Sequence, residues 1–117
     1  MESFEIKFDE SLAYPVFHVK GYYSDHTGAQ VAEKANQLLR GGKVRLIIDF
    51  TECFSINSPG IASLMDLGLI VTDDFKGRLI LTGLNTLCLK VLNIAGIIPF
   101  IESTPTIPEA IKQLETK

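Results

Sequence analysis

The stretch KVRLIIDFTECFSINSPGIASLMDLGL, residues 43–69, decides the fold. Its first part, 44–50, is an apolar run too continuous for a strand with one wet face. Such a run is typical of a central strand that is covered on both faces. We expect this strand, a short connection over 51–56, and then a helix.

The segment Asn57–Gly60 predicts where that helix begins. Ser58 is suited to be the N-cap, because its hydroxyl can accept a hydrogen bond from a backbone N–H of the first turn. Pro59 would then occupy the first helical position, where a missing N–H costs nothing. We therefore expect one hydroxyl at a helix N-terminus, at the end of a strand and at the surface.

The residues before this stretch predict a hairpin and a helix. Apolar and polar residues alternate over 4–9, which indicates a half-buried edge strand, and 16–20 forms a second strand after a turn. Gly21 is expected to end that strand. A helix capped by Ser24 or Asp25 follows, with an apolar face of helical spacing, and Gly41-Gly42 is expected to end it.

The helix from Pro59 is expected to run to about Thr72. Its inward stripe is predicted from the helical spacing as Ile61, Leu64, Met65, Gly68 and Val71. Leu67 and Ile70 fall off this stripe. They are interpreted either as buried under a neighbouring helix or as a partner or dimer surface.

The remaining chain predicts a strand over 78–83, a short helix capped by Asn85, and a short extended piece at Pro99–Ile101. Thr106 and Glu109 have the spacing of a capping box and open a last helix. Strands that alternate with helices imply right-handed parallel crossovers. The predicted fold class is α/β, with a mixed, mostly parallel sheet of four to five strands flanked by α-helices.

Composition limits the classes of function. The 117 residues are expected to form a single domain over 1–117, and no run reaches the roughly 18 apolar residues of a membrane span. The N-terminus is acidic and alternating rather than a signal peptide, so we expect a cytoplasmic protein without direct membrane insertion. The net charge is −3 with scattered Lys and Arg, which does not favour nucleic acid as a partner.

Motifs for catalysis or cofactor binding are missing from the sequence. It has no GxxxxGK(S/T), GxGxxG, HExxH or GxSxG segment, so we expect no enzyme activity, no cofactor and no metal. Cys53 and Cys88 are interpreted as small buried hydrophobic residues. Asp49 is either a lone carboxylate site or a residue that bonds a nearby loop N–H. A hydrolase built on Ser58 would need His18 or His26 close by.

The segment LIIDFTECFSINSPGIASL resembles the signature of STAS domains, the fold of anti-sigma factor antagonists. In that pattern an apolar strand is followed by a turn and then by D-(S/T)-(S/T)-G. Four further segments are similar in the same order: Gly21 with its aromatic neighbours, GRLILTG at 77–83, VLNIAGI at 91–97, and EAI at 109–111. The resemblance therefore extends over nearly the whole chain.

This resemblance implies a regulatory binding protein. The hydroxyl that a partner phosphorylates in the family corresponds to Ser58, and the partner is a serine kinase and anti-sigma factor of the GHKL ATPase type. The sequence departs from the family pattern at Asn57, where the family has Asp, and at Pro59, which replaces the second hydroxyl residue. The alternative is that Ser58 is only an N-cap in a domain that binds partners without being switched.

The expected contact surface combines the 57–69 segment with the end of the hairpin. Its predicted partner-binding residues are Tyr22, Tyr23, Ser24, Asn57, Ser58, Pro59, Gly60, Ile61 and Leu64. The helix over 61–71 adds apolar area for docking or for a homodimer. A second hypothesis keeps the STAS-like fold but makes the chain a constitutive subunit of a lipid or anion transport complex or of a larger signalling assembly.

Overall fold

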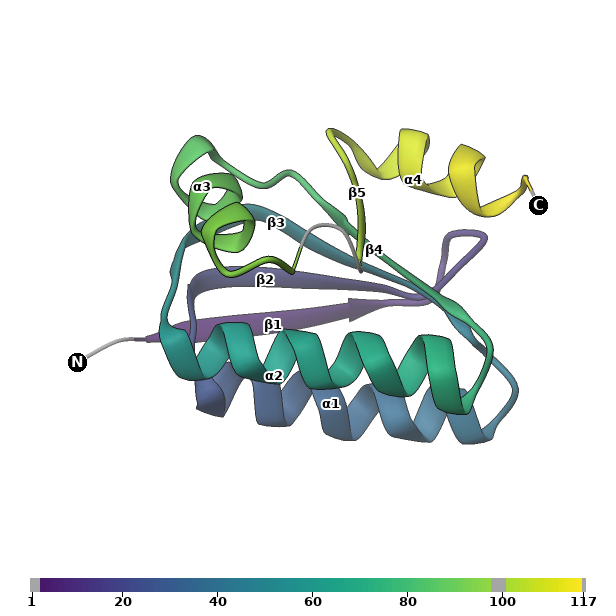
Figure 1. Ribbon diagram of the computed structural model, residues 1–117. Coiled ribbons are helices and arrows are strands. Elements are labelled where there is room, and N and C mark those ends of the chain that lie inside the picture. The colour runs from purple at the N-terminus through teal and green to yellow at the C-terminus, as the bar shows by residue number, and fades with distance from the viewer. Residues whose placement is uncertain (1–2, 98–100, 117) are drawn as a thin grey trace.

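One sheet with the strand order β1-β2-β3-β4-β5 runs through the computed structural model, which describes residues 3–97 and 101–116 (Figure 1). β1 is antiparallel to β2, and the other neighbouring strands are parallel. The predicted mixed, mostly parallel sheet is therefore confirmed. In chain order the elements are β1 Phe4–Asp9, β2 Val16–Tyr23, α1 Asp25–Arg40, β3 Arg45–Ile56, α2 Ser58–Leu69, a π-helical turn η1 Ile70–Asp74, β4 Arg78–Thr82, α3 Thr86–Ile94, β5 Glu102–Thr104 and α4 Ile107–Leu114.

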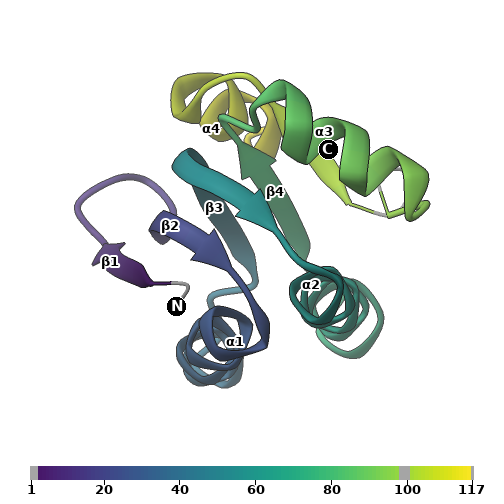
Figure 2. The same cartoon turned by 90° about the vertical axis from the view of Figure 1, so that its left-hand side faces the viewer.

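Helices cover both faces of the sheet. α1 and α2 lie side by side on one face, while α3 and α4 lie on the other (Figure 2). Alternate residues of β3 enter the two layers, because Leu46 and Ile48 belong to the large core and Ile47 belongs to a smaller cluster with Ala110 and Leu114 of α4. This double coverage explains the unbroken apolar run over 44–50.

The two central strands are longer than the sequence predicted. β3 continues through Ile56, so the expected connection over 51–56 is part of the strand. β2 continues through Gly21 to Tyr23, and Tyr23 pairs with Ile56. Gly21 has a φ of 94°, and a Cβ there would lie 2.4 Å from the carbonyl oxygen of Ser3. Gly21 therefore allows an irregular pairing within the strand rather than ending it.

The helix ends follow the sequence in most places. Ser24 caps α1 and exchanges hydrogen bonds with Thr27, and Gly42 follows the helix with a φ of 92°. Asn85 caps α3 by accepting from the backbone N–H of Cys88, and the predicted capping box of Thr106 and Glu109 is present at α4. Each of these predictions is confirmed.

α2 differs from its prediction on its outer side and at its end. Leu67, expected off the inward stripe, is 2% exposed and belongs to the main core. Of the two interpretations of this residue, the structure therefore supports burial and not a partner surface. The α-helix ends at Leu69 and is followed by η1, where the N–H of Phe75 bonds to the carbonyl oxygen of Ile70. The predicted extended piece at Pro99–Ile101 lies mostly outside the described residues, and the nearby strand is β5 at Glu102–Thr104. Within residues 3–97 and 101–116, none of the helices has the length and apolarity needed to cross a membrane.

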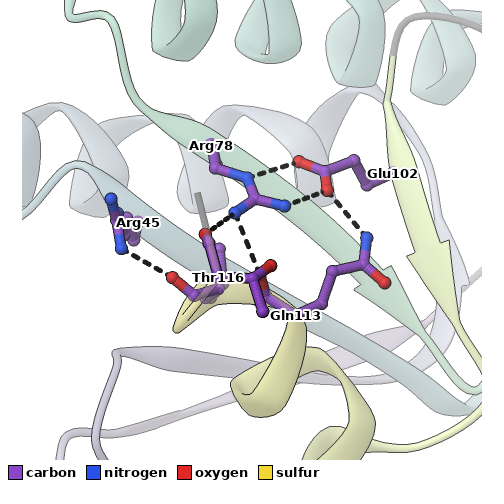
Figure 3. Close-up of polar contacts among 6 residues, drawn as sticks. Arg45, Arg78, Glu102, Gln113 and Thr116 are labelled. Atoms are coloured by element: carbon purple, nitrogen blue, oxygen red, sulfur yellow. Dashed lines mark hydrogen bonds and ion pairs between the residues drawn. The ribbon is translucent and has the colours of Figure 1, made fainter.

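A polar network attaches the C-terminal helix to the sheet (Figure 3). Arg78 of β4 makes two hydrogen bonds to the carboxylate of Glu102 in β5, and its Nη1 donates to the carbonyl oxygens of Gln113 and Thr116, both at 3.0 Å. Arg45 of β3 donates to the carbonyl oxygen of Leu114 at 2.6 Å. Two guanidinium groups thus satisfy carbonyls at the end of α4, where positive charge is favoured.

Glu102 makes stability depend on pH. The hydrogen bond from Arg78 lowers the pKa of Glu102, and Gln113 adds to this effect against the opposing effect of burial. Because the folded pKa lies below the unfolded one, this contribution is present above about pH 4.3 and is lost as the pH falls through the folded pKa. We expect Glu102→Gln to lower the free energy of unfolding at pH 7 by about 1 kcal/mol, a small value because the pair is partly exposed.

Urea unfolding between about pH 7 and pH 3 measures this effect. The difference between wild type and Glu102→Gln should shrink to near zero at the acidic end. Glu33→Gln on the exposed side of α1 controls for the loss of one negative charge. A difference that stays constant over this pH range would show that the ion pair does not stabilise the fold.

Candidate functional site at the N-terminus of α2

The N-terminus of α2 begins one residue earlier than predicted. Asn57 is the N-cap, and its side-chain Oδ1 accepts the backbone N–H of Gly60 at 2.8 Å. Ser58 is the first helical residue and Pro59 the second, so the assignment of Ser58 as the cap was wrong. Asn and Ser are comparable caps, and here the extended backbone of Asn57 continues from the end of β3.

Gly60 brings this helix end against the end of β2. A Cβ at Gly60 would lie 2.2 Å from the carbonyl oxygen of Tyr23, closer than any real contact. The same carbonyl oxygen accepts the backbone N–H of Asn57 at 3.1 Å. The close approach therefore fixes the turn that carries Ser58 to the carboxyl end of the parallel strands, where ligands and partners commonly bind in open α/β sheets.

Ser58 and Pro59 are both exposed at this end of the sheet. Few backbone N–H groups of the first turn are available beside the Ser58 hydroxyl. Pro59 has none, and the N–H of Gly60 is used by Asn57. No acidic side chain lies in the first turn of α2 as described, so the positive end of the helix dipole is not offset there.

An apolar rim at the carboxyl end of the parallel strands, the end at which Ser58 also lies, was not predicted in full. The rings of Tyr22 and Phe54 meet edge to face with centroids 6.0 Å apart, and the side chain of Phe54 is 62% exposed. Leu87 is 53% exposed, and its helix is tied to this strand because Asn85 donates from Nδ2 to the carbonyl oxygen of Phe54. Phe54 was missed because the segment 51–56 was expected to be a short connection, and Leu87 was missed because it was counted among the apolar residues of the short helix that follows Asn85.

Most of the other predicted partner-binding residues are buried. Tyr23 and Leu64 are fully buried, Ser24 is 7% exposed, and Ile61 packs partly exposed against the core. The Tyr23 ring lies 5.4 Å from that of Phe50. These residues support the site, whereas Tyr22, Ser58 and Pro59 reach its surface.

The buried groups under the site are held in their neutral forms. Burial raises the pKa of the Tyr23 hydroxyl, with a further contribution from Cys53, and this hydroxyl has no partner within the described part of the chain. A hydrogen bond with Cys88 and burial raise the pKa of Cys53. Both cysteines are free thiols and buried, which confirms the interpretation of them as small core residues.

A separate polar cluster surrounds Asp49 in the middle of β3. Nδ1 of His18 lies 2.9 Å from Oδ2 of Asp49, while Thr51 donates to Oδ1 through both its N–H and its hydroxyl. Burial by itself would raise the pKa of Asp49, but the hydrogen bonds from Thr51 and His18 outweigh it and lower the pKa. Asp49 thus bonds a backbone N–H two residues on, as one reading of the sequence expected.

This cluster does not supply a base to Ser58. At about 3.3 Å per residue, the part of β3 from Asp49 to Ile56 is roughly 23 Å long, and Ser58 lies beyond its end, while His18 lies beside Asp49. His26 is exposed in the first turn of α1, and no carboxylate in residues 3–97 and 101–116 pairs with it. The arrangement of base and carboxylate that a serine hydrolase needs is not assembled at Ser58. In the same residues no group of three or more candidate metal ligands comes together.

Comparison with solved structures identifies the fold. An anti-sigma factor antagonist from Mycobacterium paratuberculosis superposes with a TM-score of 0.82 at 14% sequence identity, over 97% of this chain and 96% of the other. The chain has the STAS fold. An anti-sigma factor antagonist (STAS) domain protein from Planctomyces limnophilus has a TM-score of 0.73 at 17% identity, over 95% of this chain and 98% of its own.

A third similar structure is the Bacillus cell fate determinant SpoIIAA in its phosphorylated form. Its TM-score is 0.69 at 21% identity, and the match covers 95% of this STAS-fold chain and 100% of SpoIIAA. No protein-family model and no curated protein sequence matches the chain. The expected fold is therefore established by similarity of the three-dimensional structures. Their sequences are only 14–21% identical to this chain, and comparison of sequences found no match.

Gly60→Ala tests the close approach that positions the site. Because the added methyl would overlap the carbonyl oxygen of Tyr23, we expect a loss of about 2–4 kcal/mol in the free energy of unfolding. Gly41→Ala is the matched control, since Gly41 has a φ of −82° and a Cβ there would meet only ordinary contacts. Its effect should stay within about 0.5 kcal/mol. Equal urea midpoints for the two variants would contradict the constraint at Gly60.

Proposed function

We propose that this chain is a regulatory protein-binding module of the anti-sigma factor antagonist kind, and that it docks through the surface around Ser58. The observation that carries the proposal is an exposed hydroxyl on the first residue of α2, at the carboxyl end of the parallel strands. At the same end Phe54 and Leu87 are exposed, and the half-buried ring of Tyr22 packs against Phe54. Exposed apolar side chains and a polar group at the same end of a sheet are typical of a protein-binding surface. The chain acts by binding and does not catalyse a reaction.

Phosphorylation of Ser58 is the proposed control of this binding. A phosphoryl group adds about −1.5 to −2 charges at pH 7. The fold tolerates this charge because it sits at the positive end of α2 and meets no acidic residue in that first turn. The phosphate would gain little shelter from the backbone, since Pro59 lacks an N–H and Gly60 donates to Asn57.

The charge would therefore face the partner rather than the helix. A partner surface that fits the neutral serine and the apolar rim must desolvate the phosphate when it binds. A coupling of about 3 kcal/mol between the two states would change the affinity roughly 150-fold, which suffices for a switch. Asn57, which stands where the family has aspartate, favours the phosphorylated state, because a neutral cap does not repel the phosphate.

The proposed partner is a serine kinase and anti-sigma factor of the GHKL type. This assignment comes from the resemblance at 46–64, and it is supported by the similarity of the fold to SpoIIAA, whose structure is known in a phosphorylated form. The kinase would transfer the γ-phosphoryl group of ATP to the Ser58 hydroxyl and release ADP and a proton. The phosphorylated chain and the kinase would then separate.

Affinity capture from the native host tests the proposal, with wild type, Ser58→Ala and Ser58→Asp as baits. We expect wild type and Ser58→Ala to retain a GHKL-type ATPase and Ser58→Asp to lose it, with at least a tenfold weaker affinity when the isolated pair is titrated. Ser103→Asp is the matched control, because it adds the same charge at an exposed position of β5. It should bind as wild type does.

Other outcomes would reject specific parts of the proposal. Equal binding of the ATPase by all four proteins would remove the switch at Ser58 and leave a constitutive binding module. Capture of a membrane transport component, equal for wild type and Ser58→Asp, would favour a regulatory subunit of a transport complex. Incubation of the captured ATPase with ATP, followed by mass spectrometry of this chain, locates the phosphorylated residue directly.

A further inference from the structure

β1 has a free edge on the side away from β2 (Figure 2). The orientation of its backbone groups follows from the pairing of the hairpin. The N–H of Tyr22 bonds to the carbonyl oxygen of Ser3, so Ser3 and every second residue after it direct their N–H and C=O groups to β2. Phe4, Ile6 and Phe8 consequently direct theirs outward.

The side chains of β1 are divided between the two faces of the sheet in the same alternation. Phe4, Ile6 and Phe8 are half-buried on the face covered by α1, where the Lys34 ammonium lies 4.5 Å from the centre of the Phe8 ring. Glu5 and Lys7 are exposed on the opposite face. The free edge therefore combines three outward backbone positions, a half-covered apolar row and two exposed opposite charges.

We propose that a second copy of this chain adds to this edge, with β1 antiparallel to the partner's β1 and a two-fold axis through Ile6. In this register Ile6 faces the partner's Ile6, and Phe4 faces the partner's Phe8. The residues with outward backbone groups are opposite one another, so about six backbone hydrogen bonds can form. The two five-stranded sheets become one continuous sheet, and the closed two-fold symmetry prevents further growth.

Charge selects this register over its neighbours. Glu5 faces the partner's Lys7 and Lys7 faces the partner's Glu5, which extends the hairpin pairing of Glu5 with Lys20 into a row of alternating charge. A shift of two residues in one direction places Lys7 opposite Lys7 and Glu5 opposite Asp9, and a shift in the other direction places Glu5 opposite Glu5. Like charges directly opposite one another are unfavourable.

The layer of helices leaves room for the second copy. Neighbouring strands lie about 4.8 Å apart, so β2 and the partner's β2 would be about 14 Å apart. α1 contacts both β1 and β2, and two such helices need only 8–10 Å between their axes. The paired Phe4 and Phe8 rings would lie below the gap between the two α1 helices. The second copy would thus cover these rings, which are half-exposed in a single copy.

Charge reversal followed by charge exchange tests the register. Sedimentation velocity from about 1 µM to 1 mM should show a reversible monomer–dimer equilibrium for wild type. Glu5→Lys converts both intermolecular pairs into like-charge pairs and should raise the dimer dissociation constant at least about tenfold. Glu5→Lys combined with Lys7→Glu restores both pairs and should return the constant to within about threefold of wild type. Circular dichroism of each variant confirms that the monomer remains folded.

Hydrogen exchange on the wild-type chain provides a test without substitutions. As concentration rises, the amides of Phe4, Ile6 and Phe8 should gain protection, whereas those of Glu5 and Lys7, which already bond to β2, should not change. A wild-type chain that remains monomeric at about 1 mM overturns the proposal. A dimer that Glu5→Lys leaves intact, or that the double exchange fails to restore, also overturns it. Neither result bears on the proposed role of Ser58.

Discussion

The contact of Gly60 with the carbonyl oxygen of Tyr23 is the constraint on which the candidate site depends. One backbone oxygen accepts the N–H of Asn57 and lies where any side chain at residue 60 would be. It therefore joins the end of β2, the end of β3 and the first turn of α2 at one point. The position of Ser58 follows from this junction, because Ser58 lies between the cap residue and the glycine.

The fold separates three tasks in space. Ser58 lies at the carboxyl end of the parallel strands, where the apolar side chains of Phe54 and Leu87 are also exposed. The guanidinium groups of Arg45 and Arg78 act at the C-terminus of α4, where they bind carbonyls at the end of that helix. The free edge of β1 lies at one side of the sheet. A substitution in one of these regions therefore does not alter direct contacts of the residues in the other two.

Local errors in the sequence interpretation share one physical cause. Ser58 was expected to be the cap because of its hydroxyl and the following Pro59. Pairing with β2 extends β3 six residues beyond Phe50 to Ile56, and Asn57, directly after the strand, is the cap. Gly21 has the local properties of a strand end, yet it lies within β2 because β3 continues past it and pairs with Tyr22 and Tyr23. Pairing between distant segments provides hydrogen bonds that local preferences cannot anticipate.

Patterns within single segments were enough to determine the class of fold, the caps of α1, α3 and α4, and the place of a serine at the start of a helix after a buried strand. These features depend on residues that are close in the sequence, so the local sequence is enough to predict them. Tertiary structure alone decided which of the predicted residues reach solvent. Tyr23 and Leu64 are buried because they pack into the main core, while the side chain of Phe54, near the end of β3, is left exposed. Burial depends on how the helices and the sheet pack together, so it cannot be predicted from any single segment.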